Sequence, residues 1–228
     1  MQRKKTKTFK VKKGGIEKSK RYSIEDALQL VLESSYEKFD PSLELHIRTG
    51  IDPRKGDQIV RGSVVLPHAS GKTKKIAVFA EGDKAKEALG AGVDIVGGQE
   101  MIEQIKQTGK ADFDIAIATP DMMKSLASVA RILGPRGLMP SPKNNTVTAN
   151  VRSAIEEVKK GRLDFKNDTG GTVHITIGKK SLGNEKLLAN YSACMEALRK
   201  VRPSTVKGAY IRTISLSSTM GPGIFVQP

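Results

Sequence analysis

Residues Arg131 to Val147 read Arg-Ile-Leu-Gly-Pro-Arg-Gly-Leu-Met-Pro-Ser-Pro-Lys-Asn-Asn-Thr-Val, and the rest of the chain is arranged around this stretch. Three prolines and two glycines fall between Gly134 and Pro142. Each proline fixes its own φ and disfavours helix in the residue before it, whereas Gly134 and Gly137 can adopt positive φ. We therefore predict a long, stiff and irregular loop.

The loop carries three basic residues, Arg131, Arg136 and Lys143. A basic loop that is ordered by covalent constraint more often has a function than a plain connector. A proline-rigidified lid over the edge of a sheet explains the composition equally well, because the loop contains no catalytic residue type. The sequence therefore leaves a binding loop and a structural lid as open interpretations.

The middle of the chain, on both sides of this loop, alternates short apolar runs with amphipathic segments. Strands that alternate with helices indicate βαβ units and a parallel sheet. The runs at 75–80, 93–96 and 113–118 predict strands, and the segments 83–89, 100–107, 119–132 and 151–160 predict helices.

The two ends of the chain have a different pattern, in which apolar and polar residues alternate. We expect antiparallel pairs of sequence-neighbouring strands, with one helix for each pair. Strands are predicted at 43–48, 59–66, 162–166, 172–177 and 210–218, and helices after the N-cap residue Ser23 and at 184–199.

Each terminal segment is too small to bury a core by itself, so we predict that the two segments form one domain. The predicted fold is a discontinuous α+β terminal domain, residues 1–69 and 160–228, with an inserted three-layer β/α parallel-sheet domain at 70–159. Two sequential domains are the alternative.

The net charge of +15 and the isoelectric point near 9.9 indicate a polyanionic partner, with nucleic acid as the first candidate. The charge is uneven: residues 1–22 hold ten basic residues and one acidic residue, a net +9, and residues 160–228 hold a net +7. Residues 70–159 hold only +2. The tail 1–22 is expected to be disordered when free, and it could either remain solvated or settle on phosphates.

The chain has no apolar run near the ~20 residues that a membrane span needs, and its basic start lacks the apolar segment of a secretory signal. The single cysteine, Cys194, fits a reducing compartment and falls near the apolar face of the helix at 184–199. We therefore expect a cytoplasmic protein with no membrane partner. We expect Cys194 to be a buried core residue.

The search for catalytic chemistry gives no convincing site. The three histidines, His46, His68 and His174, show no metal-ligand spacing to Cys194 or to one another. A Cys194–His174–Asp168 triad can be written, but a cysteine on a helix face is usually part of the core. We predict no enzyme, no catalytic residue, no metal and no cofactor.

Three short segments have binding chemistry instead. Phe39 lies beside Lys38 and could stack on a base while the ammonium meets phosphate. It could equally fasten a helix to the sheet. The second segment is Thr219-Met220-Gly221, whose glycine leaves the backbone open to close approach by a ligand; it could also be a plain strand end. The third is Lys166-Asn167-Asp168, which could bind phosphate and sugar hydroxyls or could simply cap a turn.

Four segments together resemble the bacterial form of the ribosomal protein L-one family. They are Gly134-Pro-Arg-Gly-Leu-Met-Pro-Ser-Pro-Lys143, Lys38-Phe39-Asp40, Gly50-Ile-Asp-Pro-Arg-Lys-Gly-Asp-Gln58 and Ser218-Thr-Met-Gly-Pro222. The likeness runs in order over essentially residues 20 to 226, which makes it specific.

The resemblance implies a terminal domain that binds large-subunit ribosomal RNA directly, and an inserted domain in a mobile stalk that helps to release tRNA from the exit site. It also implies repression of the chain's own operon through its messenger RNA, and a monomer when free of the ribosome. The family's RNA face corresponds to Lys38, Phe39, Lys166, Thr219, Met220 and Gly221. The resemblance assigns no role to the basic tail.

Two other classes of function compete with this interpretation. A nucleotide-using β/α enzyme with a basic appendage would bind a free nucleotide detectably. A nonspecific basic RNA chaperone would bind any RNA with similar affinity, so specific and nonspecific affinities at stated salt separate it from a ribosomal protein.

Overall fold

The structure of the 228-residue chain is a computed structural model that describes residues 20–68, 75–159 and 161–227. The chain divides into two compact units, which are described separately below. Met1–Gly71 and Leu163–Pro228 form the terminal unit, and Lys72–Arg162 form the inserted unit. Among the described residues, none of the helices is long and apolar enough to cross a membrane.

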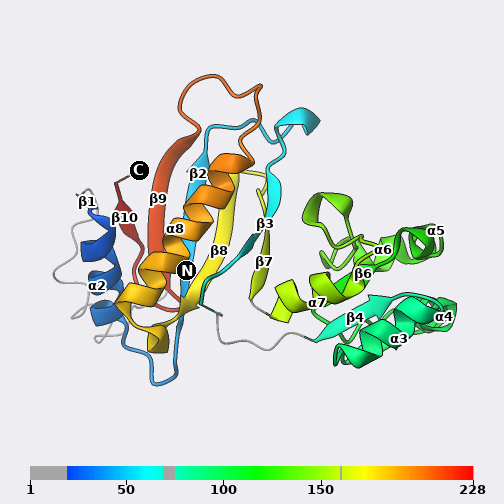
Figure 1. Cartoon of the computed structure of the whole chain (residues 1–228). Coiled ribbons are helices and arrows are strands. Elements are labelled where there is room, and N and C mark those ends of the chain that lie inside the picture. Colours follow the sequence, from blue (N-terminus) through cyan, green and yellow to red (C-terminus); the bar gives the residue numbers. More distant parts are fainter. Residues whose placement is uncertain (1–19, 69–74, 160, 228) are drawn as a thin grey trace, which may run out of the picture. The chain divides into compact units, whose positions relative to one another are not determined.

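The terminal unit is built on a five-stranded mixed sheet (Figure 1). The strand order is β1 (Arg21–Tyr22), β10 (Ile224–Val226), β9 (Ile211–Ser218), β2 (Ser42–Thr49) and β8 (Thr172–Lys179). β1 runs parallel to β10, and the other neighbours are antiparallel. The chain's first and last described strands therefore lie side by side.

Alternation along β2 gives this sheet one buried face and one open face. Leu43, Leu45 and Ile47 are buried, whereas Glu44 and His46 between them are partly exposed. Helices α2 (Ile24–Ser34) and α8 (Asn184–Lys200) cover the buried face and share one apolar core with the strands. The polar face of the sheet is left uncovered by the described residues of this unit.

Helix α2 begins where the sequence predicts, because Ser23 caps it. The Ser23 hydroxyl oxygen accepts a hydrogen bond from the Asp26 backbone N–H at 3.2 Å and donates to the Asp26 carboxylate at 2.7 Å. This cap fixes the point at which the chain turns from β1 into the helix.

The predicted pairing of sequence-neighbouring strands is wrong. β2 pairs with β8 and β9, and β3 (Arg61–Val65) pairs with β7 (Arg162–Lys166) in a separate two-stranded sheet. An isolated hairpin buries too little apolar surface to be stable. Pairing across the two terminal segments satisfies both edges of β2 and encloses a single core.

Two strands are missing from the sequence-based prediction, β1 and β10. Each is only two or three residues long, too short for an alternating pattern to be recognised. Because Arg21 and Tyr22 belong to β1, the end of the segment that we expected to be a disordered tail is part of the sheet. Residues 1–19 of that predicted tail lie outside the described residues.

The inserted unit contains a parallel three-stranded sheet in the order β5 (Ile95–Gly97), β4 (Ile76–Phe79) and β6 (Ile115–Ala118). Every residue of β4 is buried, so helices must cover both faces. Helices α3 (Asp83–Gly90) and α7 (Val151–Lys159) pack on one face, and α4 (Gln99–Thr108) and residues 120–133 pack on the other. This three-layer arrangement confirms the predicted fold class.

The helix predicted at 119–132 is not continuous. It alternates between 3₁₀ turns and α-helical turns, as η2 (Pro120–Met122), α5 (Met123–Leu126), η3 (Ala127–Val129) and α6 (Ala130–Leu133). Within it, the Ser128 hydroxyl donates to the Ser125 carbonyl at 2.8 Å, a local bond that competes with the helical ladder.

The predicted irregular loop follows α6, and its two glycines have different roles. Gly137 has a φ of +72°, whereas Gly134 has a φ of −58° and closes the helix. A Cβ on Gly134 would lie 2.7 Å from the Ala130 carbonyl oxygen, so close backbone approach requires this glycine. After a 3₁₀ turn, η4 (Pro142–Asn144), Val147 forms a parallel bridge with Ala118 of β6. This end of the loop covers a sheet edge.

Candidate nucleic-acid interface

The candidate residues of the terminal unit lie in two clusters at opposite ends of β2. The Met220 cluster, Lys38, Phe39, Thr219, Met220 and Gly221, lies at the Ser42 end. The Asp168 cluster, Lys166, Asn167 and Asp168, lies at the other end, where Arg48 pairs with Thr172. The six residue-to-residue steps from Ser42 to Arg48 correspond to roughly 20 Å of strand, so the sequence-predicted residues form two clusters and not one.

The turn of the Met220 cluster is fastened to β2 by several hydrogen bonds. Ser42 N donates to Thr219 Oγ1 and Thr219 N donates to the Ser42 carbonyl, both at 3.1 Å. The Tyr36 hydroxyl donates to the Met220 carbonyl at 3.2 Å. The segment that carries Lys38 and Phe39 is thereby tied to a turn more than 170 residues later in the sequence.

Two large apolar side chains of this cluster are solvent-exposed. Phe39 and Met220 are each 56% exposed, although apolar side chains of this size are usually buried. The exposure argues against the interpretation of Phe39 as a staple between helix and sheet, because a staple would be covered by both elements. It leaves an apolar surface beside Lys38.

Gly221 is required by its surroundings and not by a positive φ. Its φ is not positive, and its N–H donates a hydrogen bond to the Ser218 carbonyl at 3.1 Å. A Cβ on Gly221 would overlap with Ser218 Oγ. Ser218 is buried, and its hydroxyl has no hydrogen-bond partner among the described residues.

In the Asp168 cluster the turn is built by the acidic residue itself. Asp168 Oδ1 accepts backbone hydrogen bonds from Gly170 at 2.9 Å and from Thr172 at 2.7 Å. The bond from Thr172 is the main reason that the pKa of Asp168 lies below its ordinary value. This carboxylate is therefore ionised at neutral pH and held at the surface.

Asn167 has a structural part in the same turn. It is only 8% exposed, its Oδ1 accepts from Val60 N at 2.9 Å, and its Nδ2 donates to the Asp168 carbonyl at 2.9 Å. The amide that we expected to meet RNA is thus engaged within the fold. Lys166 and Asp168 on either side of it are exposed.

The strip between the clusters contains residues that the sequence-based search missed. His46 of β2 is directly opposite His174 of β8, and the two Nδ1 atoms are 2.8 Å apart. His46 Nε2 lies 3.0 Å from Ser217 Oγ. From the sequence we considered the histidines only for metal-ligand spacing, and a separation of 128 residues conceals a strand register. The sequence offered one signal for this strip: the polar residues that alternate with buried ones along β2 mark His46 as part of the open face.

Burial is the main cause that lowers the pKa of His46, and the neighbouring His174 lowers it further. The carboxylate of Glu44, 3.9 Å from His46 Nε2, acts in the opposite direction. His46 therefore resists protonation more than an ordinary histidine does.

The Cys194–His174–Asp168 triad does not form. His174 and Asp168 do lie together, with His174 Nε2 3.5 Å from Asp168 Oδ2. Cys194 is completely buried in the core beneath the sheet, and burial raises its pKa to about 12. An inaccessible thiol with that pKa is not a nucleophile at neutral pH.

The basic loop residues belong to the inserted unit. Arg131 and Arg136 are exposed, and Lys143 lies in η4. The prediction that all three lie in the loop is wrong for Arg131, which belongs to helix α6, whereas Arg136 lies in the loop between Gly134 and Gly137. In the described part of the chain, no group of three or more His, Cys, Asp or Glu residues could hold a metal ion.

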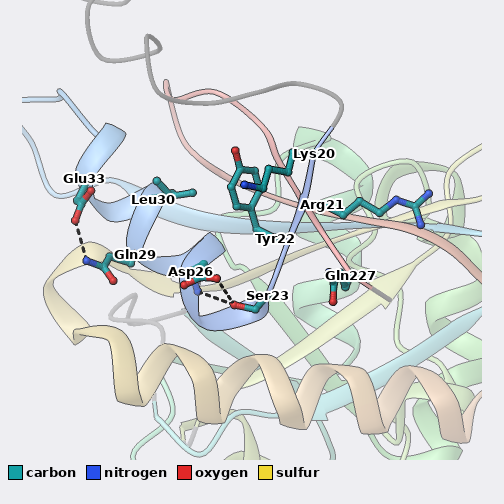
Figure 2. Close-up of a pocket in the computed structure, with 9 residues that line it drawn as sticks. All are labelled: Lys20, Arg21, Tyr22, Ser23, Asp26, Gln29, Leu30, Glu33 and Gln227. Atoms are coloured by element: carbon teal, nitrogen blue, oxygen red, sulfur yellow. Dashed lines mark hydrogen bonds between the residues drawn. The ribbon is translucent and has the colours of Figure 1, made fainter.

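A cavity of about 510 Å³ lies beside β1 and α2 of the terminal unit (Figure 2). Its polar wall is engaged in internal hydrogen bonds, between Ser23 and Asp26 and between Gln29 and Glu33. Lys20 lies over the ring of Tyr22, with Nζ 5.4 Å from the ring centroid. The mixture of acidic and basic residues gives this cavity no preference for an anion.

A comparison with protein-family models supports a family assignment. The model described as the ribosomal protein L1p/L10e family matches residues 31–222. The matched range contains both clusters, the strip between them and the proline-containing loop.

Proposed function

The chain belongs to the ribosomal protein L1p/L10e family, and from this premise we propose that the open face of its terminal unit binds a folded site in large-subunit ribosomal RNA. Family membership establishes a non-enzymatic ribosomal protein whose partner is large-subunit ribosomal RNA. The four resembling segments support the bacterial form of the family.

The observation that carries the proposal is the Met220 cluster. Two exposed apolar side chains, Phe39 and Met220, lie on segments joined by the Tyr36–Met220 hydrogen bond. RNA bases and riboses offer flat apolar surfaces that stack on such side chains, while Lys38 can meet a phosphate. Gly221 lets the turn pack closely against the buried Ser218 and so fixes the position of Met220.

The Asp168 cluster supplies polar recognition at the other end of β2. An ionised carboxylate accepts hydrogen bonds, and the ribose 2′-hydroxyl is a donor that DNA lacks. Asp168 therefore suits a sugar hydroxyl and Lys166 a phosphate. We assign Asn167 the role of holding this turn, because its amide is used inside the fold.

For the inserted unit we propose the role in the stalk, in which it helps to release tRNA from the exit site. Its support is the exposed Arg131 in helix α6 and the exposed Arg136 in the loop that follows, with Lys143 in the next turn. The net charge of only +2 over residues 70–159 is consistent with a few local phosphate contacts and not with a broad basic surface.

We further propose that the same face of the terminal unit binds the messenger RNA of the chain's own operon and represses its translation. One face can serve both purposes if the messenger reproduces the shape of the ribosomal site. The protein is proposed to be a monomer in the cytoplasm when it is not on the ribosome, so that one face is available to either RNA.

A nonspecific RNA chaperone remains the alternative, favoured by the net +9 of residues 1–22. The test compares affinity for a ribosomal RNA fragment containing the site with affinity for an unrelated duplex at several salt concentrations. A specific ribosomal protein should prefer the fragment by at least about a thousandfold and show a shallow salt dependence. Equal affinities, or a steep slope that disappears with residues 1–22, would support the chaperone.

A further inference from the structure

A chain of four polar side chains crosses the open face of the terminal sheet from one cluster to the other. Ser217 touches His46, His46 touches His174, and His174 reaches Asp168 of the Asp168 cluster. Ser217 precedes Thr219 of the Met220 cluster by two residues. The chain thus connects the two proposed RNA-binding clusters, and the proposed contacts make no use of its imidazoles.

The geometry fixes how many protons this chain can hold. Two ring nitrogens 2.8 Å apart need one proton between them, because two lone pairs or two N–H groups repel each other. In the neutral pair, Ser217 donates to His46 Nε2, His46 Nδ1 donates to His174 Nδ1, and His174 Nε2 donates towards Asp168. Every group then has a partner.

One added proton leaves the chain intact. If the proton is on His46, this ring donates from Nε2 to Ser217 and from Nδ1 to His174, and His174 still donates to Asp168. If it is on His174, that ring donates to Asp168 on one side and to His46 Nδ1 on the other. The neutral His46 changes tautomer and donates from Nε2 to Ser217. A second added proton would place an N–H on both Nδ1 atoms, so the contact between the two rings must open.

Charged and polar groups from three segments surround the pair. Strand β2 contributes Glu44, whose carboxylate lies 3.9 Å from His46 Nε2, and Arg48, which follows His46 by two residues. The turn after β7 contributes Asp168. Strand β9 presents only hydroxyl groups to the pair, at Thr213, Ser215 and Ser217. Burial and the neighbouring ring lower the pKa of His46, whereas the carboxylate of Glu44 acts in the opposite direction.

We propose that His46 and His174 are positioning residues that hold the two clusters in register while they share at most one added proton, and that a second proton weakens specific RNA binding. This inference rests on the proposed RNA-binding function of the same face. Its sign is diagnostic, because acidification adds positive charge near phosphates and would by itself tighten RNA binding.

The experiment compares the full-length protein with His46→Gln, His174→Gln and the matched control His68→Gln. His68 is the third histidine of the chain and is hydrogen-bonded to Asn190 through its backbone. Affinities for the ribosomal RNA fragment and for an unrelated duplex are measured from about pH 8 to about pH 5.5, the range in which histidine titrates. The imidazole ¹⁵N resonances of the free protein are followed over the same range.

We expect the specific affinity of the unchanged protein and of His68→Gln to fall about threefold to tenfold on acidification, the size of one lost hydrogen bond. His46→Gln and His174→Gln should already be weaker by a similar factor at high pH and should not fall further. The resonances should show two coupled steps.

Specific binding that rises steadily on acidification would overturn this inference without affecting the proposed function. The same holds if the His46→Gln and His174→Gln variants keep the affinity and the pH profile of the unchanged protein. Independent titration of the two rings would also overturn it. Failure to distinguish the ribosomal fragment from the duplex at any pH would instead refute the proposed function.

Discussion

At the scale of single residues, the exposed ring of Phe39 is the most direct test of the binding surface. A buried Phe truncated to Ala costs about 3–5 kcal/mol of stability, whereas an exposed side chain usually costs within about 0.5 kcal/mol. Because Phe39 is more than half exposed, we predict that Phe39→Ala leaves the melting temperature nearly unchanged. Affinity for the ribosomal RNA fragment should fall by about 1–3 kcal/mol, as for a lost stacked base.

The matched control is Leu89→Ala, which truncates another exposed apolar side chain, on α3 of the inserted unit. It should change neither property. Calorimetric melting and titration binding on the same preparations separate the effects. A large loss of stability in Phe39→Ala, with an affinity that follows it, would return Phe39 to the role of a packing residue.

Gly221 allows a test that includes its own rescue. We predict that Gly221→Ala lowers specific RNA affinity about tenfold or more, because the new Cβ would collide with Ser218 Oγ and displace the turn. Adding Ser218→Ala removes the obstructing hydroxyl, so the double variant should recover most of the affinity.

Surface plasmon resonance on the single and double variants measures this recovery. If Gly221→Ala binds normally, the close approach has no importance for RNA. If Ser218→Ala fails to rescue a weakened Gly221→Ala variant, the methyl group itself blocks the RNA.

At the scale of elements, the buried face of helix α8 determines the reactivity of Cys194. Cys194 faces the core, and burial raises its pKa to about 12, so almost none of the thiol is ionised near pH 8. We predict that an aromatic disulfide reagent leaves Cys194 unmodified in the folded protein. In denaturant, labelling should proceed at the rate of a free thiol. Rapid labelling of the native protein would show that α8 opens locally.

The sign of the pH effect follows from the raised pKa. Cys194 is neutral in both folded and unfolded protein below the unfolded pKa, so it has no effect on stability there. Above that pKa the unfolded thiol ionises and the folded one does not, which favours unfolding. Alkaline pH should therefore lower the melting temperature of the protein more than that of a Cys194→Ser variant, each compared with its own value at neutral pH.

At the scale of the whole molecule, the terminal unit contains its own core, formed by strands and helices from both ends of the chain. We predict that a chain joining residues 1–69 to 160–228 folds and keeps most of the affinity for the ribosomal RNA fragment. The piece 70–159 should bind it weakly. The expected contrast reflects both clusters on the terminal unit and the small net charge of the inserted residues.

Circular dichroism and filter binding on both pieces measure folding and affinity. Equal affinity of piece 70–159 for the fragment would show that the RNA face has been assigned to the wrong unit. An unfolded joined chain would call for the intact protein with Met220→Ala, which tests the same face without removing a unit.

Much of the fold could be read from the sequence because its signals are local. Continuous apolar runs identified β4 and β6, alternation identified β2, and Ser23 marked the start of α2. Candidate site residues could be named individually for the same reason, since each stands out by its type within a short turn. Short strands such as β1 and β10 lack such a signal, because two or three residues cannot show a period.

The sequence by itself determined which residues alternate, which glycines and prolines constrain the backbone, and to which family the chain is similar. Only the tertiary structure decided that β2 pairs with β8 and β9, and therefore that His46 meets His174 across 128 residues of sequence. It also decided that Asn167 faces inward and that Phe39 remains exposed. The physical reason is that alternation defines the two faces of a strand, whereas its neighbours and register depend on how distant segments together bury one core.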